Sequence, residues 1–108
     1  MTAANHYFVY VIRLSTDALQ RKKFRDENPQ YIEGFDCFYV GMTGRTPALR
    51  FEQHKNGYKA CGLAKDFGVE LMPQSYGCIN PRTYVEAQKL ERRVAKRLRR
   101  RGFAVWQR

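Results

Sequence analysis

Residues 37–57 have the sequence CFYVGMTGRTPALRFEQHKNG and place a strand directly before a helix. The first seven residues are mostly apolar or aromatic, which is typical of a buried strand. Thr46 suits the N-cap of a helix, Pro47 its first position, and Gly57 the residue after its end. These signals predict a strand and then a helix over 47–56, with a tight connection between them.

The flanking sequence adds further elements. The apolar run 7–14 predicts a second long strand. The remaining signals predict a short helix at about 60–67, a short strand over 69–72, a long helix at about 82–101, and a strand or extended tail over 103–106. The polar segment 15–36 is an insertion between the first two strands, where Asp17 could cap a helix running to about Arg25. Its composition indicates no role. The 108 residues suffice for a single domain.

Positive charge is concentrated near the C-terminus. The chain carries a net charge of +10, and residues 82–108 contribute ten basic side chains against two acids, Glu86 and Glu91. Such a field attracts polyanions, and nucleic acid is the commonest one inside cells. A solvated helix face is the plainer alternative. A membrane-surface helix is less favoured, because the segment has no apolar aromatic stripe.

From the sequence we expect neither a secretory signal nor a membrane span. Its longest apolar run, Tyr7–Ile12, is far shorter than a membrane span, and residues 1–5 lack a basic-then-apolar pattern. Three cysteines, Cys37, Cys61 and Cys78, have irregular spacing and form no zinc motif with the two histidines. We expect reduced thiols in a cytoplasmic protein that associates with the nucleoid if it is bacterial.

Four short motifs occur in a fixed order along nearly the whole chain. They are Phe8-Val9-Tyr10, Tyr39-Val40-Gly41, Arg50-Phe51-Glu52-Gln53-His54, and the helix residues Glu86-Ala87, Leu90-Glu91 and Val94-Ala95-Lys96. In this order and context they resemble the GIY-YIG nuclease superfamily. The chain departs from the family pattern in three ways: Phe8 replaces the first glycine, the gap between the strands is longer, and Gln107 is the nearest amide where some members have an asparagine.

The resemblance implies an α/β (α+β) fold, with a small three-stranded, mainly antiparallel sheet flanked by helices over residues 1–108. It also implies a DNA endonuclease that hydrolyses phosphodiester bonds with one Mg²⁺ or Mn²⁺ ion. The implied catalytic residues are Tyr10, Tyr39, Arg50, His54 and Glu91, with Glu91 as the metal ligand. The resemblance assigns Tyr10 as general base, with Tyr39 and His54 positioning water and phosphate.

The side chains themselves are consistent with this chemistry. A single carboxylate such as Glu91 suits a Mg²⁺ ion that keeps most of its waters. Arg50 can donate two hydrogen bonds at once to a phosphate. An ordinary tyrosine has a pKa of about 10 and is a poor base at neutral pH, whereas histidine titrates at about 6.5. Tyr10 and His54 both remain candidate bases.

Structural roles are the alternatives for each residue. The two tyrosines could be ordinary strand aromatics, His54 a surface residue, Arg50 an ion-pair partner of Glu52 or Glu91, and Glu91 a salt-bridge hub. Glu86 is the backup carboxylate. The candidate nucleic-acid contacts are Lys55, Lys59, Lys65, Arg92, Arg93, Lys96 and Arg99.

We therefore expect a nuclease of low sequence specificity, acting on DNA in preference to RNA, with a protein partner as a further source of specificity. The alternative is a non-catalytic nucleic-acid-binding module or accessory subunit with the same fold. That alternative predicts binding that weakens steeply with salt and is never followed by cleavage.

Overall fold

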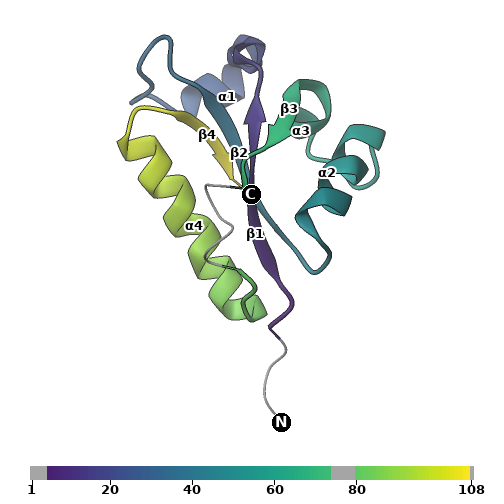
Figure 1. Ribbon diagram of the computed structural model, residues 1–108. Coiled ribbons are helices and arrows are strands. Elements are labelled where there is room, and N and C mark those ends of the chain that lie inside the picture. The colour runs from purple at the N-terminus through teal and green to yellow at the C-terminus, as the bar shows by residue number, and fades with distance from the viewer. Residues whose placement is uncertain (1–4, 74–79, 108) are drawn as a thin grey trace.

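Four strands form one mixed sheet in the order β3-β1-β2-β4 (Figure 1). The computed structural model describes residues 5–73 and 80–107, so Cys78 lies outside the described part. The long strands β1 (Phe8–Leu14) and β2 (Cys37–Thr43) pair antiparallel, and β3 (Gly68–Leu71) pairs antiparallel with β1. The fourth strand, β4 (Ala104–Gln107), runs parallel to β2. The segment left open as strand or tail is thus a strand, one more than the three expected.

Helix α2 (Pro47–Asn56) has the predicted bounds, because its local signals operate as expected. The Thr46 side chain accepts a hydrogen bond from the Leu49 backbone N–H and caps the helix. At the other end Gly57 has φ +85°, a left-handed conformation that glycine adopts without steric cost. Helix α3 (Gly62–Phe67) follows and packs against α2.

Helix α4 (Tyr84–Arg100) is the longest helix and begins two residues after the predicted start. Thr83 and Glu86 form a reciprocal capping box there, which gives Glu86 a structural role. The buried stripe of α4 consists of Ala87, Glu91 and Ala95. Leu90, Val94 and Leu98 on the same helix are only half-buried. The two small alanines let α4 approach the sheet closely, and the carboxylate between them is carried inward with the helix.

The insertion 15–36 covers the outer edge of β4. Its expected single helix is two short ones, a 3₁₀ helix η1 (Thr16–Gln20) capped by Ser15 and α1 (Lys22–Asp26). The buried Asn28 side chain accepts a hydrogen bond from Val105 N at 2.7 Å and donates one to Val105 O at 3.0 Å. The amide thereby replaces a neighbouring strand on the exposed edge of the sheet.

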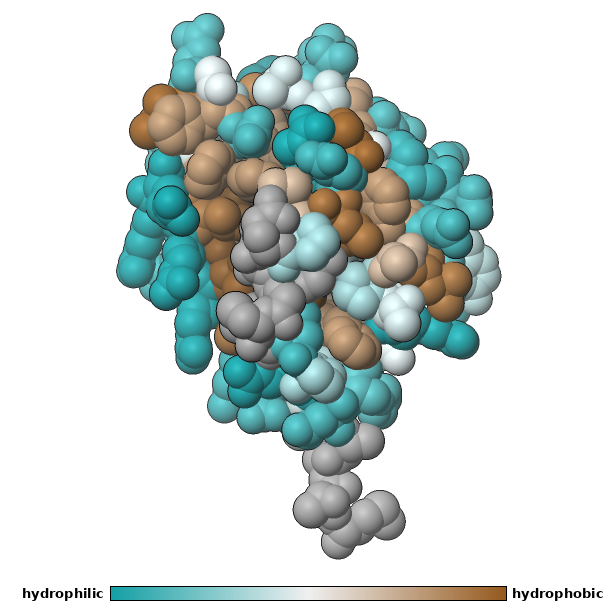
Figure 2. Space-filling view, in the orientation of Figure 1, coloured by the Kyte–Doolittle hydropathy of each residue, from teal (hydrophilic) through white to brown (hydrophobic). Residues whose placement is uncertain are grey.

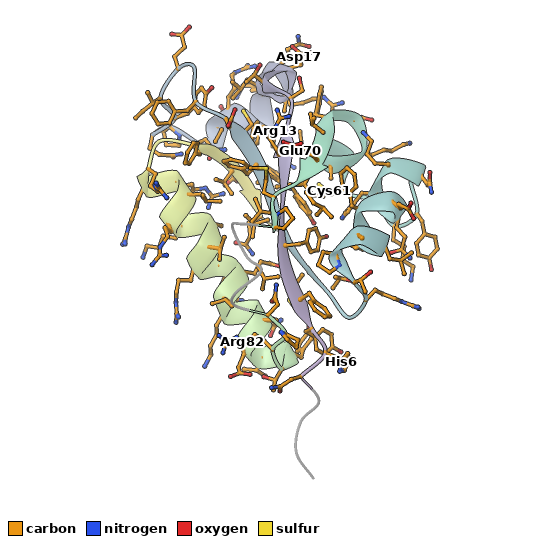
Figure 3. All side chains as sticks on the ribbon, viewed as in Figure 1. His6, Arg13, Asp17, Cys61, Glu70 and Arg82 are labelled. Atoms are coloured by element: carbon orange, nitrogen blue, oxygen red, sulfur yellow. The ribbon has the colours of Figure 1, made fainter. Side chains whose placement is uncertain are left out.

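Helices cover both faces of the sheet. Figure 1 shows α4 on one side of the sheet, with α2 and α3 on the other. The core lies between these layers and is built from β1 and β2, where Val9, Val11, Ile12 and Val40 have no exposed surface. At the outer end of the sheet, Arg13 of β1 pairs with Glu70 of β3 at 3.1 Å (Figure 3). None of the described helices is long and apolar enough to cross a membrane.

Candidate functional site

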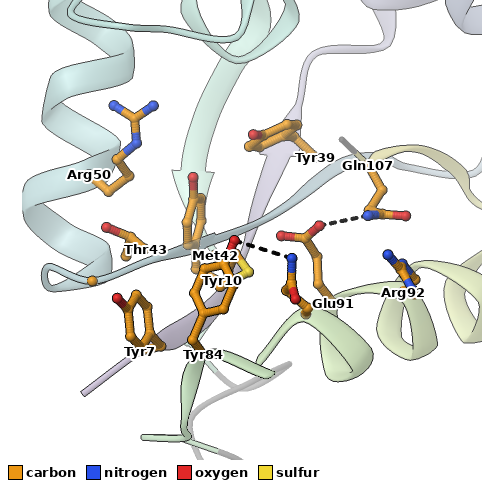
Figure 4. Close-up of a pocket in the computed structure, with 12 residues that line it drawn as sticks. Tyr7, Tyr10, Tyr39, Met42, Thr43, Arg50, Tyr84, Glu91, Arg92 and Gln107 are labelled. Atoms are coloured by element: carbon orange, nitrogen blue, oxygen red, sulfur yellow. Dashed lines mark hydrogen bonds between the residues drawn. The ribbon is translucent and has the colours of Figure 1, made fainter. Parts of the chain in front are cut away.

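A pocket of about 420 Å³ opens where β2 extends beyond β4. Strand β4 ends with Gln107 opposite Val40, whereas β2 continues to Thr43, so this stretch of β2 has no neighbour on that side among the described strands. Helices α2 and α4 flank the gap from opposite faces of the sheet (Figure 4). The described lining residues are Tyr7, Tyr10, Tyr39, Met42, Thr43, Gly44, Arg50, Tyr84, Gln88, Glu91, Arg92 and Gln107.

Four of the five residues predicted to be catalytic line this pocket. Tyr10 comes from β1, Tyr39 from β2, Arg50 from α2 and Glu91 from α4. The fifth, His54, lies behind them with no exposed surface, so it is not a surface helix residue. Side chains from four elements, spread over more than 80 positions of sequence, therefore converge on one cavity.

Gly41 allows the Tyr10 ring to lie across β2. The two residues are direct partners in the β1–β2 register. A Cβ atom at Gly41 would come within 2.6 Å of the Tyr10 hydroxyl oxygen and within 2.9 Å of the Tyr39 ring. Real Cβ atoms essentially never approach other heavy atoms this closely. The glycine of the second motif is thus a steric requirement of the site, because only a bare backbone leaves room for both tyrosines.

The hydrogen bonds of His54 define its tautomer. The Cys61 backbone N–H donates to His54 Nδ1 at 3.1 Å, so Nδ1 carries no proton. A neutral imidazole with a bare Nδ1 has its proton on Nε2, and Nε2 lies 2.9 Å from the Tyr10 hydroxyl oxygen. His54 therefore donates to Tyr10. The Tyr10 oxygen accepts this bond.

Burial holds both site tyrosines in the protonated form. It raises the pKa of Tyr10 to about 12, and the nearby positive charge of Arg50 only partly opposes this effect. Burial also raises the pKa of Tyr39, with a further increase from the adjacent Tyr10. Either hydroxyl needs additional positive charge nearby before it can ionise at neutral pH.

Arg50 is fixed by the loop that follows its own helix. One guanidinium nitrogen donates to the Tyr58 carbonyl at 3.0 Å, and the other donates to the Lys59 carbonyl at 2.7 Å. Gln53 accepts a third hydrogen bond from the guanidinium at 3.3 Å. Carbonyl partners hold the group in place without neutralising its charge. Arg50 therefore presents a positioned, undiminished cation at the pocket wall.

Glu91 is 7% exposed and lines the pocket from α4. Gln107 Nε2 donates to Glu91 Oε1 at 2.6 Å, so the amide noted in the sequence contacts the predicted metal ligand (Figure 4). Mg²⁺ is commonly held by one or two carboxylates, waters and substrate phosphates, and a single carboxylate at a pocket wall fits this pattern. Within residues 5–73 and 80–107, no group of three or more His, Cys, Asp or Glu side chains is arranged to hold a metal ion by protein ligands alone.

The predicted nucleic-acid contacts fall into two groups. Arg92, Arg93 and Lys96 are exposed on α4, and Arg92 also lines the pocket. Lys59 and Lys65 are exposed near the end of α2 and on α3. Two others instead support the fold. The Lys55 ammonium donates to the carbonyls of Lys65 and Gly68, and Arg99 donates to the Val105 carbonyl and to Asn28 Oδ1.

Four polar lining residues were not predicted from the sequence: Tyr7, Thr43, Tyr84 and Gln88. The sequence does carry a signal for Tyr84 and Gln88. With Glu91 they follow an i, i+4, i+7 spacing, which places all three on one face of a helix. Tyr84 also meets Tyr7 edge to face, with ring centroids 5.2 Å apart. The two aromatic rings form one rim of the pocket.

Comparison with family models, curated proteins and solved structures gives no significant match to this chain.

Proposed function

We propose that this chain is a metal-dependent nuclease that hydrolyses phosphodiester bonds of nucleic acid, as the resemblance to GIY-YIG nucleases implies. One observation carries the proposal: Tyr10, Tyr39, Arg50 and Glu91 come from four elements and line a single pocket. A binding surface has no need to bring a carboxylate, a fixed guanidinium and two hydroxyls together in one cavity. Phosphodiester hydrolysis needs a base, a cation near the phosphate and a means of activating water.

Arg50 stabilises charge that develops on the phosphate. Its guanidinium is already held by the Tyr58 and Lys59 carbonyls, so it need not reorganise as the phosphorus passes through its crowded transition state. Such a positioned donor contributes most when charge increases during the reaction, which favours an effect on rate over an effect on binding. This is the role we assign to Arg50.

Tyr10 is the better candidate for the general base. His54 Nε2 bears a proton and Nδ1 accepts the Cys61 N–H, so neither nitrogen can take a proton from water. His54 is a positioning residue, and its N–H bond to the Tyr10 oxygen favours the phenolate. The Tyr10 phenolate accepts the proton of the attacking water, the water oxygen bonds to phosphorus, and the departing oxygen takes its proton from solvent.

Glu91 is the carboxylate that would hold the divalent ion, with Gln107 fixing one of its oxygens. Bound there, such an ion would supply positive charge to the phosphate oxygens and would lower the pKa of acids near it. The additional positive charge would lower the pKa of Tyr10, which is about 12 in the presence of Arg50 alone. Binding in this proposal relies on the exposed arginines and lysine of α4, which contact phosphates rather than base edges. We therefore propose low sequence specificity and DNA as the favoured substrate, inside the cell.

A cleavage assay with paired carboxylate variants tests the proposal. The purified protein is incubated with duplex, nicked, branched and single-stranded DNA, and with RNA, in Mg²⁺ or Mn²⁺. Glu91→Gln should reduce the cleavage rate at saturating protein by about 100-fold or more, because it removes the anionic ligand. Glu86→Gln on the same helix is the control and should cleave normally, since glutamine also completes a capping box.

Two results would contradict the proposal. Cleavage that survives undiminished in Glu91→Gln would remove Glu91 from the mechanism. Tight, salt-dependent binding without cleavage under any metal would support the non-catalytic binding module instead.

A further inference from the structure

Two adjoining hollows lie beside the candidate site and share Trp106 and Cys61. One, of about 680 Å³, is also lined by Lys59. The other, of about 240 Å³, is also lined by Lys23 and Phe24. We call these five residues, together with the space they enclose, the Trp106 groove. Figure 3 labels Cys61 on the segment between α2 and α3, which forms one wall of it.

The Trp106 groove adjoins the candidate active site through three direct links. Trp106 is the register partner of Tyr39, so the two side chains project from the same face of neighbouring strands, whose backbones are about 5 Å apart. The carbonyl of Lys59 accepts the Arg50 hydrogen bond. The Cys61 N–H donates to His54. A strand of nucleic acid with its phosphate at Arg50 would reach this groove within its next nucleotides.

The groove combines an aromatic ring with uncompensated positive charge. Trp106 is half-buried and lines both hollows. Lys23 and Lys59 are exposed, and the described residues that line the hollows include no Asp or Glu. Arg21 at one end differs, because it pairs with Asp66 at 2.7 Å. An aromatic platform flanked by cations is the arrangement that binds the bases and phosphates of single strands.

From this arrangement we propose that the Trp106 groove binds an unpaired nucleotide next to the cleavage site. Its base stacks on Trp106 and its phosphates contact Lys59 and Lys23. Bases inside a duplex are stacked on one another and cannot offer a face to the indole. The inference rests on the proposed nuclease function and narrows its substrate: a duplex with a single-stranded extension at the cut should be preferred over a continuous duplex.

Trp106 is itself the reporter, because it is the only tryptophan in the chain. Tryptophan-selective fluorescence is recorded in the absence of divalent metal while two DNAs are added: a blunt duplex and the same duplex with a short unpaired thymidine extension. The extended DNA should quench the emission in a saturable way, and the blunt duplex should not. Lack of metal prevents cleavage, so the readout does not depend on catalysis.

Variants then separate stacking from charge and from folding. Trp106→Ala should weaken binding of the extended DNA by about 10-fold, whereas Trp106→Phe should retain most of the affinity. Neither should change the affinity for blunt duplex. Phe35→Ala is the control, since it removes a partly exposed aromatic ring that lines neither hollow. Lys23→Gln, at an exposed position, should weaken binding of the extended DNA and leave binding of the blunt duplex unchanged. This variant keeps the proposal testable if Trp106→Ala fails to fold.

The outcomes distinguish this inference from the proposed function. Cleavage without any quenching, or with equal quenching by both DNAs, overturns the proposed nucleotide site in the Trp106 groove and leaves the proposed nuclease function standing. Selective quenching without cleavage under any metal supports the groove as a single-strand site and overturns the nuclease.

Discussion

Helices α2 and α4 flank the same pocket, yet they use their basic and polar side chains in opposite ways. On α2 the basic side chains Arg50, His54 and Lys55 are all bound to the segment that follows the helix. Arg50 donates to the Tyr58 and Lys59 carbonyls, His54 accepts from Cys61 N, and Lys55 donates to the carbonyls of Lys65 and Gly68.

On α4 the basic side chains near the middle of the helix face solvent. Arg92, Arg93 and Lys96 are exposed, and their side chains make no hydrogen bond or ion pair with another residue in the described part of the chain. Figure 2 shows hydrophilic side chains along the edge of the molecule where Figure 1 places α4. Only near the C-terminal end does Arg99 turn back to Val105 and Asn28.

The contrast distinguishes two functions of positively charged side chains that the net charge of the chain does not distinguish. A cation that stabilises a transition state must be held in place before the reaction, and α2 provides such a cation. A cation that attracts a polyanion works from a flexible, hydrated side chain, and α4 provides several. Substitutions of the bound basic residues on α2 should therefore change rate and stability, whereas substitutions of the exposed basic residues on α4 should change affinity and its salt dependence.

The largest expected effect is at Arg50. Arg50→Ala should lower the single-turnover rate at saturating protein by about 100-fold or more, while DNA affinity changes little. The variant should also lose about 1 to 3 kcal/mol of stability, because two loop carbonyls lose a charged donor. Arg50→Lys should restore little of the rate, since an ammonium cannot form the two-pronged contact.

Hydrogen exchange of the backbone amides of residues 57–61 checks the structural part of this prediction. These amides should exchange faster in Arg50→Ala. Arg45→Ala serves as the control, because Arg45 is an exposed arginine just before α2. Loss of affinity in parallel with rate would place Arg50 among the ordinary phosphate contacts and break the contrast between the helices.

The structural role of Arg50 was not predictable from the sequence. Local signals defined β2 and α2 to the residue, because a cap, a proline and a glycine act within a few positions of themselves. The sequence also put Arg50 on the correct helix. Its partners, however, are carbonyl oxygens whose positions depend on how the chain folds after Gly57, and no residue type signals them.

Strand β4 and the two fold-supporting residues Lys55 and Arg99 show the same limit of sequence-based prediction. Strand β4 is four residues long and pairs with β2, more than 60 positions earlier, so no local pattern assigns it to the sheet. Lys55 and Arg99 were grouped with the nucleic-acid contacts because their side chains are basic. The convergence of Tyr10, Arg50 and Glu91 was predicted only through the family resemblance. Sequence periodicity assigns each residue to a strand or helix but does not show that the three side chains lie close together.

The second prediction concerns pH and the buried hydroxyl on the α2 side. The folded pKa of Tyr10 is about 12, against about 10 for an unfolded tyrosine. Below about pH 10 both states keep the proton, so stability is unaffected. Between about pH 10 and 12 the unfolded chain loses the proton first, and stability falls as pH rises. Tyr39 acts in the same direction, because burial raises its pKa too.

Tyr10→Phe isolates this contribution. At neutral pH the variant should be about 1 to 3 kcal/mol less stable, since the buried His54 N–H loses its acceptor. Its stability should then fall less steeply than that of the wild type above about pH 10. Denaturant unfolding across the alkaline range measures both effects, with Tyr58→Phe as an exposed control. Parallel pH curves for Tyr10→Phe and wild type would mean that Tyr10 ionises as freely when folded as when unfolded.

The third prediction tests the α4 side. Replacing Arg92, Arg93 and Lys96 together by glutamine should weaken DNA binding by about 10-fold or more at moderate salt. The slope of log affinity against log salt should flatten by about 2 to 3, with similar losses for all sequences. The rate at saturating protein and the thermal stability should stay near wild type. An unchanged salt slope would show that this surface of α4 does not meet nucleic acid.

The smallest effect comes from a matched pair of lysines, one on each helix. Lys55→Met should lower stability by about 1 kcal/mol, because the carbonyls of Lys65 and Gly68 lose their donor, and should leave the salt slope unchanged. Lys96→Met should leave stability within about 0.5 kcal/mol of wild type and reduce the slope by about 1. Both substitutions remove the same charge, so the long-range field changes equally. If the two variants bind DNA equally weakly and are equally stable, net charge alone governs binding, and the distinction between bound and exposed cations has no functional meaning.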